Sequence, residues 1–318
     1  MTDAECDPQE TAVSVPIIAF FNIKGGVGTT SLVYHLAWMF SDLQVKVLAV
    51  DMDPQANLTT AFIGAGMPGS VHDSLAHVVN ESLVLLPSDL KTAAFEEDFA
   101  LQWQRAMNGD EQSFGVICGP WRLMRMLTPI YKVQLILVDL GPNLSAINRA
   151  GLMAADHVVI PLTPDLLSVL GLEILGSTLR KWRGDWQERL ARSPSKDVEL
   201  PAGGMAPLGY VVQQPGFAMR ANDDWTNWIP EYYRKFILDA PPTSGISILN
   251  DLEKLAVLRP YRSLLAMAQE ARKPMFHLKP ADGAIGAHLQ SAEDARKDFE
   301  ALAKAIVAKA NLSSVFAR

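Results

Sequence analysis

A glycine-rich stretch near the N-terminus, Lys24-Gly25-Gly26-Val27-Gly28-Thr29-Thr30, has the residue types of a phosphate-binding turn. It lies between an apolar run of strand length, residues 15–21, and a segment with apolar residues at helical spacing, residues 31–40. Such a turn points several backbone N–H groups at one spot, and the dipole of the following helix also favours an anion there. The stretch therefore predicts a site for a nucleotide phosphate.

The turn departs from an ordinary phosphate-binding loop at one position. Such a loop places a lysine directly before a Ser/Thr pair, so that the ammonium meets the β- and γ-phosphates while the hydroxyl binds Mg²⁺. In this chain Thr29 occupies the lysine position, whereas Lys24 stands five residues earlier. The turn therefore has a lysine at its first residue, Lys24, and none at the position next to the Ser/Thr pair.

The sequence KGGVG followed by Thr-Thr resembles the deviant Walker A loop of the ParA/MinD family of P-loop ATPases, whose pattern is KGGxGK[ST]. The resemblance implies that Lys24 reaches across a nucleotide-sandwich dimer to the partner's phosphates, as a catalytic residue. It also implies that ATP is bound by the loop and the start of the helix, and that Thr30 contacts Mg²⁺. The ATP-binding residues implied are Gly25, Gly26, Val27, Gly28, Thr29, Thr30 and Ser31.

Three later blocks extend the resemblance in the same order along the chain. Residues 45–50 read as a buried strand that ends in Asp51-Met52-Asp53-Pro54-Gln55, which is similar to the family's strand with two aspartates. By that similarity Asp53 positions the attacking water and Asp51 lies near Mg²⁺. Residues 133–138 lead into Asp139 and Gly141-Pro142, which implies a second metal-side aspartate, and residues 148–165 match the family's next helix and strand.

The alternation of strand and helix patterns predicts a three-layer α/β/α P-loop fold with a mostly parallel, twisted sheet. Active groups should then gather at the carboxyl ends of the strands. Strands are expected near 16–22, 45–50, 134–139, 157–161 and 207–213, and helices near 29–41, 91–108, 144–154, 166–182, 261–272 and 291–310.

We expect one large domain, residues 15–312, after a flexible tail, residues 1–14. Two stretches, 64–130 and 193–260, do not fit a minimal chain of this family. The second is dense in proline and carries Trp225, Trp228, Tyr232 and Tyr233. These aromatic residues form either a partner surface or an anchor that holds a long loop on the core.

Composition limits the other classes of protein. The 318 residues are 49% hydrophobic but contain no apolar run of eighteen or more, which argues against a membrane span. The acidic, polar start does not read as a targeting segment, so we expect a cytoplasmic location. Cys6 and Cys118 are too few for a disulfide framework or a cysteine-bound iron–sulfur cluster, and no histidine spacing suggests a metal other than nucleotide-bound Mg²⁺.

DNA binding and membrane attachment depend on local charge, because the formal net charge of the chain is −7. ParA-like proteins commonly coat DNA without sequence preference, through surface Lys and Arg. The candidates form two groups that are equally well explained as solvated helix faces: Arg180, Lys181, Arg183, Arg189 and Arg192, and Arg296, Lys297, Lys304 and Lys309. A terminal membrane-binding helix is not expected, since residues 311–318 carry one cation and the preceding apolar positions should pack on the sheet.

The resemblance thus implies an ATP- and Mg²⁺-binding ATPase that switches between monomer and homodimer to position DNA or another cargo, with a protein partner that the sequence does not identify. A second reading stays open, because Thr29 replaces the loop lysine. In that reading the chain is a nucleotide-sensing scaffold that binds ATP but hardly hydrolyses it.

Overall fold

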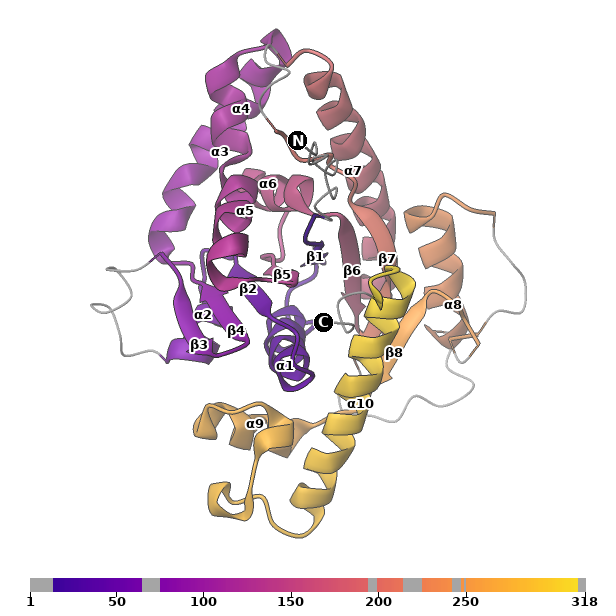
Figure 1. The fold of residues 1–318 in the computed structure, drawn as a ribbon. Helices are drawn as coiled ribbons and strands as arrows, with labels where there is room; N and C mark the ends of the chain where they lie inside the picture. The colour runs from indigo at the N-terminus through magenta and orange to yellow at the C-terminus, as the bar shows by residue number, and fades with distance from the viewer. Residues whose placement is uncertain are drawn as a thin grey trace, which may run out of the picture.

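An 8-stranded sheet forms the centre of the computed structural model, in the order β3-β4-β2-β5-β1-β6-β7-β8 (Figure 1). The structure describes residues 14–64, 75–193, 199–213, 225–241, 247, 248 and 250–313. Neighbouring strands run parallel except for the antiparallel pair β3 and β4. The strands are β1 (Ile17–Phe20), β2 (Val47–Asp51), β3 (His77–Asn80), β4 (Leu83–Leu86), β5 (Leu135–Asp139), β6 (His157–Leu162), β7 (Ala206–Gln213) and β8 (Lys254–Leu258).

Helices cover both faces of this sheet, which confirms the three-layer α/β/α prediction (Figure 1). One face packs against α1, α9 and α10, and the other against α3 to α8. The helices are α1 (Thr29–Asp42), α2 (Asn57–Ile63), α3 (Glu96–Arg105), α4 (Glu111–Ile117), α5 (Gly119–Tyr131), α6 (Ala146–Ala154), α7 (Leu166–Leu190), α8 (Trp225–Tyr232), α9 (Arg262–Ala271) and α10 (Ala287–Lys309).

The central strands are apolar along their whole length because both of their faces are buried. In β1, Ile17 and Ala19 join the core under α5 to α7, while Ile18 and Phe20 join the core under α1 and α10. Successive side chains point to opposite faces of a strand, so a continuous apolar run supplies both cores.

The register of the strands aligns the ends of β1, β2 and β5. Phe20 is opposite Asp139, and Asp51 is opposite Asp139 on the other side. The glycine-rich turn after β1, the aspartates at the end of β2 and the loop after β5 therefore leave the sheet at the same edge, as the sequence predicts for parallel strands.

The predicted strands are confirmed, and so are the predicted helices, with α7 eight residues longer than expected. The prediction missed β3, β4, β8, α2, α4, α5 and α8. Gly115 and Gly119 interrupt the apolar pattern of this stretch. They lie within α4 and at the start of α5, where buried Trp121 anchors the helix on the core.

The aromatic residues of the proline-rich stretch have different environments. Tyr233 is fully buried and packs against Tyr210, with ring centroids 5.0 Å apart, so it anchors its segment on the core. Trp228 is 37% exposed. The side chain of Trp225, the tail before residue 14, and residues 65–74, 214–224 and 314–318 lie outside what the structure describes. Among the described helices, none combines the length and apolar character needed to cross a membrane.

Candidate functional site

The glycine-rich turn joins β1 to α1 with two residues in the left-handed region. Gly26 has a φ of 75° and Gly28 a φ of 83°, a conformation that glycine adopts without steric cost. Gly28 also lies close to the side chain of Gln213 at the end of β7, since a Cβ there would come within 2.6 Å of Oε1 and would require that flexible side chain to move. The turn therefore has the backbone shape of an anion-binding loop at a helix N-terminus.

Asp51 is the last residue of β2, and Asp53 follows two residues later. Their carboxylates differ in the number of hydrogen bonds that they accept from the described residues. The carboxylate of Asp51 accepts hydrogen bonds from the Asp53 amide at 3.1 Å, and from the amide and hydroxyl of Thr59 at 2.8 and 2.7 Å. Burial raises the pKa of Asp51 to about 6, although these hydrogen bonds oppose the rise. Within the described part of the chain, the Asp53 carboxylate accepts a hydrogen bond only from the Gln55 amide, at 3.0 Å, and the residue lines the cavity described below.

Asp139, at the end of β5, is a buried carboxylate without compensation. It is 0% exposed, and neither of its oxygens has a hydrogen-bond partner of regular geometry among the described residues. Burial, followed by the charge of nearby Asp51, raises its pKa well above the usual range, while the Thr30 hydroxyl lies close enough to oppose that rise. Carboxylate and hydroxyl oxygens are the ligands that Mg²⁺ prefers, so this pair suits a magnesium site.

The loop after Asp139 is fixed by two residues whose roles the sequence did not predict. The side-chain amide of Asn148 donates to the carbonyls of Gly141 and Asn143, both at 2.7 Å. Glu96, at the start of α3, accepts hydrogen bonds from the amides of Ala146 and Ile147 at 2.6 and 3.0 Å. The helix predicted near 91–108 therefore supports the N-terminal end of α6 through Glu96, a contact that the sequence did not predict.

A cavity of about 710 Å³ opens beside the glycine-rich turn. This volume lies within the range of small-molecule sites. Its wall contains most of the predicted nucleotide-binding residues, together with residues of α1, α2 and α9. Three of the predicted site residues, Val27, Asp51 and Asp139, are buried and do not line the cavity. The lining residues include Lys24, Gly25, Gly26, Gly28, Thr29, Thr30, Ser31, His35, Asp53, Pro142, Gln269, Arg272 and Lys273.

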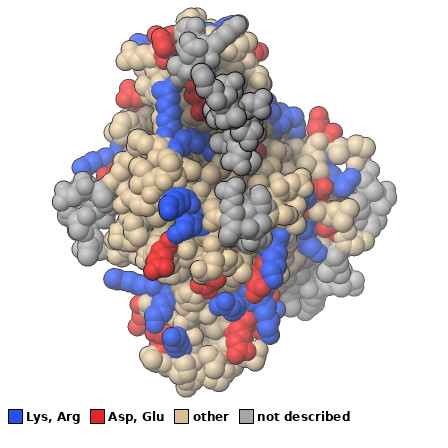
Figure 2. Space-filling view, viewed as in Figure 1, with Lys and Arg blue, Asp and Glu red and all other residues tan. Residues whose placement is uncertain are grey.

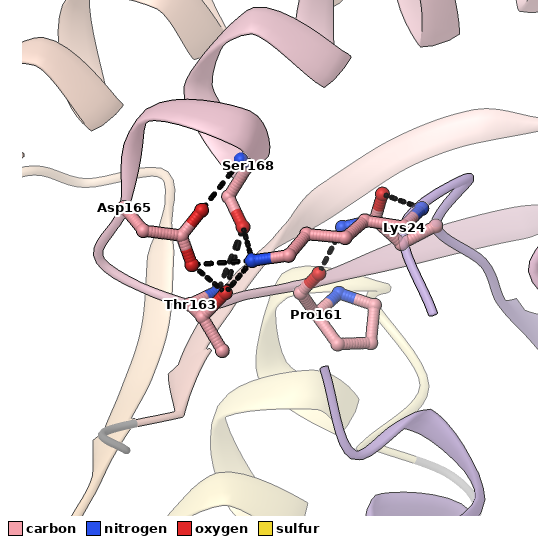
Figure 3. Close-up of polar contacts among 6 residues, drawn as sticks. Lys24, Pro161, Thr163, Asp165 and Ser168 are labelled. Atoms are coloured by element: carbon pink, nitrogen blue, oxygen red, sulfur yellow. Dashed lines mark hydrogen bonds and ion pairs between the residues drawn. The ribbon is translucent and has the colours of Figure 1, made fainter. Parts of the chain in front are cut away.

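Lys24 does not point at the predicted phosphate site of its own chain. Its ammonium forms an ion pair with Asp165 and donates to Thr163 Oγ1 at 2.8 Å, with Ser168 Oγ at 3.4 Å (Figure 3). Asp165 is also the N-cap of α7, because its carboxylate accepts from the Ser168 amide at 3.0 Å. Burial opposes ionisation of Asp165, yet its hydrogen bonds with Lys24, Thr163 and Ser168 keep its pKa below the usual range.

His35, one turn after Ser31, is a buried base rather than a metal ligand. Its Nδ1 lies 2.7 Å from the Ser31 carbonyl, its ring stacks on Phe299, and its Nε2 has no hydrogen-bond partner among the described residues. Burial lowers the pKa of His35 to about 4. Within the described part of the chain, no group of three His, Cys, Asp or Glu side chains could hold a metal ion.

The basic residues considered for DNA do not form one patch. Arg189 is only 6% exposed, and its guanidinium lies 4.0 Å from the centroid of the Trp103 ring, so it is a core residue and cannot contact DNA. Arg296, Lys304 and Lys309 pair with carboxylates. On the face shown in Figure 2, Lys and Arg are interspersed with Asp and Glu. The expected packing of Phe299, Leu302, Ile306 and Val307 in the core is confirmed.

Comparison with known proteins gives a consistent result. A family described as an AAA domain matches residues 15–191. A ParA family protein from Chlamydia muridarum is 29% identical over 179 residues, which cover 51% of this chain and 64% of that protein. An uncharacterized protein from Mycobacterium tuberculosis is 29% identical over 193 residues and 55% of either chain, so this chain matches only about half the length of that relative.

Solved structures share the fold. The apo structure of McdA from Cyanothece is 17% identical, with a TM-score of 0.63, and the match covers 91% of this chain and 98% of that one. A structure of McdA in complex with ATP has a TM-score of 0.60, at 17% identity, over 92% of this chain and 96% of that one. At this level of identity the likeness establishes the arrangement of strands and helices.

Proposed function

Since the chain belongs to the AAA-domain family and resembles its ParA-like P-loop members, we propose that it binds ATP with Mg²⁺ and uses the nucleotide to switch between monomer and dimer. The switch would position DNA or another cargo. The observation that carries the proposal is the convergence, at one edge of the sheet, of an anion-binding turn with the uncompensated carboxylate of Asp139.

The residues present fit a magnesium nucleotide. The backbone amides from Gly25 to Ser31 would hold the phosphates, and Thr30 with Asp139 would face the metal ion. Asp51 is committed to Thr59 and the Asp53 amide, so we assign it to shaping this turn rather than to direct contact with the ion. When bound, Mg²⁺ neutralises charge that develops on the phosphates.

Asp53 is the best placed acceptor for a proton or a water on the cavity wall. One of its carboxylate oxygens is held by the Gln55 amide, and its carboxyl lies against Gly141, where a Cβ would come within 3.1 Å. A carboxylate held in this way can orient an attacking water.

Lys24 supports the dimer. An ammonium on this loop can meet a phosphate, yet in the single chain it is held by Asp165 on the loop between β6 and α7. Next to this ion pair, α7 begins with Leu166 and Leu167, which are 49% and 67% exposed. An exposed apolar helix start beside a releasable lysine suits an isologous contact in which each Lys24 serves the opposite site.

The direct test is the mass of the protein, by sedimentation or light scattering, with and without Mg²⁺ and a non-hydrolysable ATP analogue. We expect the parent protein to shift from monomer to dimer and Lys24→Ala to remain monomeric. Lys297→Ala, which removes an exposed lysine on α10, is the matched control and should behave as the parent. A mass that is constant with nucleotide, or a Lys24→Ala variant that still dimerises, would contradict the proposal.

The nucleotide-sensing scaffold is the second candidate, favoured by Thr29 at the lysine position. A measurement of the phosphate released from ATP distinguishes a slow ATPase from a nucleotide-sensing scaffold. A slow ATPase loses turnover in Asp53→Ala while it retains nucleotide binding. A scaffold shows nucleotide-dependent dimerisation without measurable turnover in the parent protein or in Asp53→Ala.

A further inference from the structure

Three basic side chains line the cavity beside the glycine-rich turn, and only two of them are matched by acids. Lys24 pairs with Asp165, and the ammonium of Lys273 lies 2.7 and 2.9 Å from the two carboxylate oxygens of Asp282. The side chain of Arg272, which caps the end of α9, forms no ion pair or hydrogen bond with the part of the chain that the structure describes, and only its backbone amide is bonded within the helix. Its charge is therefore available to a ligand.

The backbone at Arg272 is unusual for this residue type. Arg272 ends α9 in the left-handed region, with φ 53° and ψ 44°, a position that glycine fills in many helices. A side chain at such a position costs free energy, and residues of this kind concentrate at ligand sites. Lys132 ends α5 in the same conformation, with φ 52° and ψ 41°, so the backbone geometry does not by itself assign a ligand role to Arg272.

The guanidinium packs against the backbone of another helix end. It lies against Gly64, the residue that ends α2, where a Cβ would come within 2.8 Å of the guanidinium carbon. Gly64 itself has a φ of 86°. Two helix ends from distant parts of the sequence therefore meet at this wall of the cavity, and the guanidinium of Arg272 lies between them.

The charge balance of the site calls for such a group. A nucleoside triphosphate adds several negative charges to a cavity that already has Asp53 on its wall and Asp139 behind it. Thr29 provides no cation, and Lys24 is held by Asp165. A guanidinium binds phosphate through two parallel hydrogen bonds, which an ammonium cannot do.

We propose that Arg272 is a phosphate-binding residue of the nucleotide site, which supplies from α9 of the same chain the positive charge that Thr29 lacks. The inference rests on the proposed nucleotide binding. It assigns to the C-terminal part of the chain a role in holding the ligand, and it predicts that the residues at positions 29 and 272 substitute for one another.

The test is a cycle of four proteins: the parent, Arg272→Ala, Thr29→Lys and the double variant. Affinity for a fluorescent, non-hydrolysable ATP analogue with Mg²⁺ is measured by titration. Loss of a charged hydrogen-bonding group should weaken binding about 10- to 100-fold in Arg272→Ala. Thr29→Lys should restore most of this affinity in the double variant, and Arg272→Lys should bind between Arg272→Ala and the parent. Arg105→Ala, an exposed arginine on α3, is the matched control.

Arg272→Gly separates ligand binding from folding. Glycine relieves the left-handed backbone, so the melting temperature without nucleotide should rise, while affinity for the analogue should fall as in Arg272→Ala. A lower melting temperature together with weaker binding would indicate a structural role and overturn the inference. Unchanged affinity in both variants would also overturn it and leave the proposed function intact. No binding by the parent or by Thr29→Lys would reject both proposals.

Discussion

The ammonium of Lys24 and the carboxylate of Asp165 form an ion pair that joins the glycine-rich turn to the N-cap residue of α7 (Figure 3). Both side chains are partly exposed, at 24% and 37%, so solvent screens the pair. Lys24 can leave this partner at small cost. In the proposed dimer, Lys24 would exchange the carboxylate of Asp165 for a phosphate of the nucleotide bound to the second chain.

Asp165→Asn should make the dimer form more readily. Asparagine can still accept from the Ser168 amide and cap α7, but it gives up the ion pair with Lys24. A screened pair contributes on the order of 0.5 kcal/mol, and two such pairs break when one dimer forms. The protein concentration for half-dimerisation with Mg²⁺ and the ATP analogue should therefore fall about fivefold. Sedimentation over a concentration series measures this. An unchanged midpoint would show that the tether does not compete with dimerisation.

Asp165→Ala should differ from Asp165→Asn in stability. It removes the cap as well as the ion pair, which costs about 1 kcal/mol. Thermal melting of the ligand-free variants, compared with the parent, separates the two effects, and an equal loss in both variants would argue against a capping role.

Asp139→Asn should stabilise the ligand-free protein and abolish its response to Mg²⁺ and nucleotide. Because the folded pKa of Asp139 is raised, the fold is favoured when the carboxyl is protonated. Stability is therefore lost as pH rises from the unfolded pKa toward the folded one. The amide removes this penalty at neutral pH. Melting temperatures at pH 7.5 with EDTA test the gain in stability, and melting temperatures with Mg²⁺ and the ATP analogue test the loss of the ligand response. A variant that is still stabilised fully by the magnesium nucleotide would exclude a role of Asp139 in holding Mg²⁺.

His35→Phe should reduce the acid sensitivity of the fold. The folded pKa of about 4 lies below the ordinary value of 6.5, so the unfolded chain binds the proton first and stability is lost as pH falls between these values. The difference amounts to up to about 3 kcal/mol, and phenylalanine keeps the stacking on Phe299. The melting temperature of the parent should fall more steeply between pH 7.5 and pH 4 than that of His35→Phe, so the variant gains stability relative to the parent as the pH falls. Parallel curves would show that His35 does not titrate in this window.

Glu96→Ala should weaken the attachment of α3 to the start of α6. The carboxylate accepts from two orphan amides at the positive end of the helix, and its loss should cost about 1–2 kcal/mol. Glu97→Ala, at the exposed neighbouring position, is the control and should leave the melting temperature unchanged. Equal effects of the two variants would mean that the contact contributes nothing specific. A simultaneous loss of nucleotide affinity in Glu96→Ala alone would show that this support extends to the loop after Asp139.

The sequence determined the central part of this protein because the signals there are local. The strands β1, β2, β5 and β6 are continuous apolar runs, and each is followed within a few residues by the side chains of the site. Parallel strands place their carboxyl ends at one edge, so Thr29, Asp53 and Asp139 could be brought together before any contact was known. The hairpin of β3 and β4 and the helix α5 were missed because their short or glycine-interrupted patterns acquire meaning only through burial against the core.

The contacts of each of these groups follow from the tertiary fold and not from the local sequence. Lys24 pairs with Asp165, and Asp51 accepts from Thr59. Neither oxygen of Asp139 has a hydrogen-bond partner of regular geometry among the described residues. The sequence nevertheless presents all three aspartates in the same way, at or near a strand end. Arg272 reaches the cavity from a helix far along the chain. Contacts of this kind depend on the order of strands in the sheet and on how helices cross it, and no local pattern of residues encodes either.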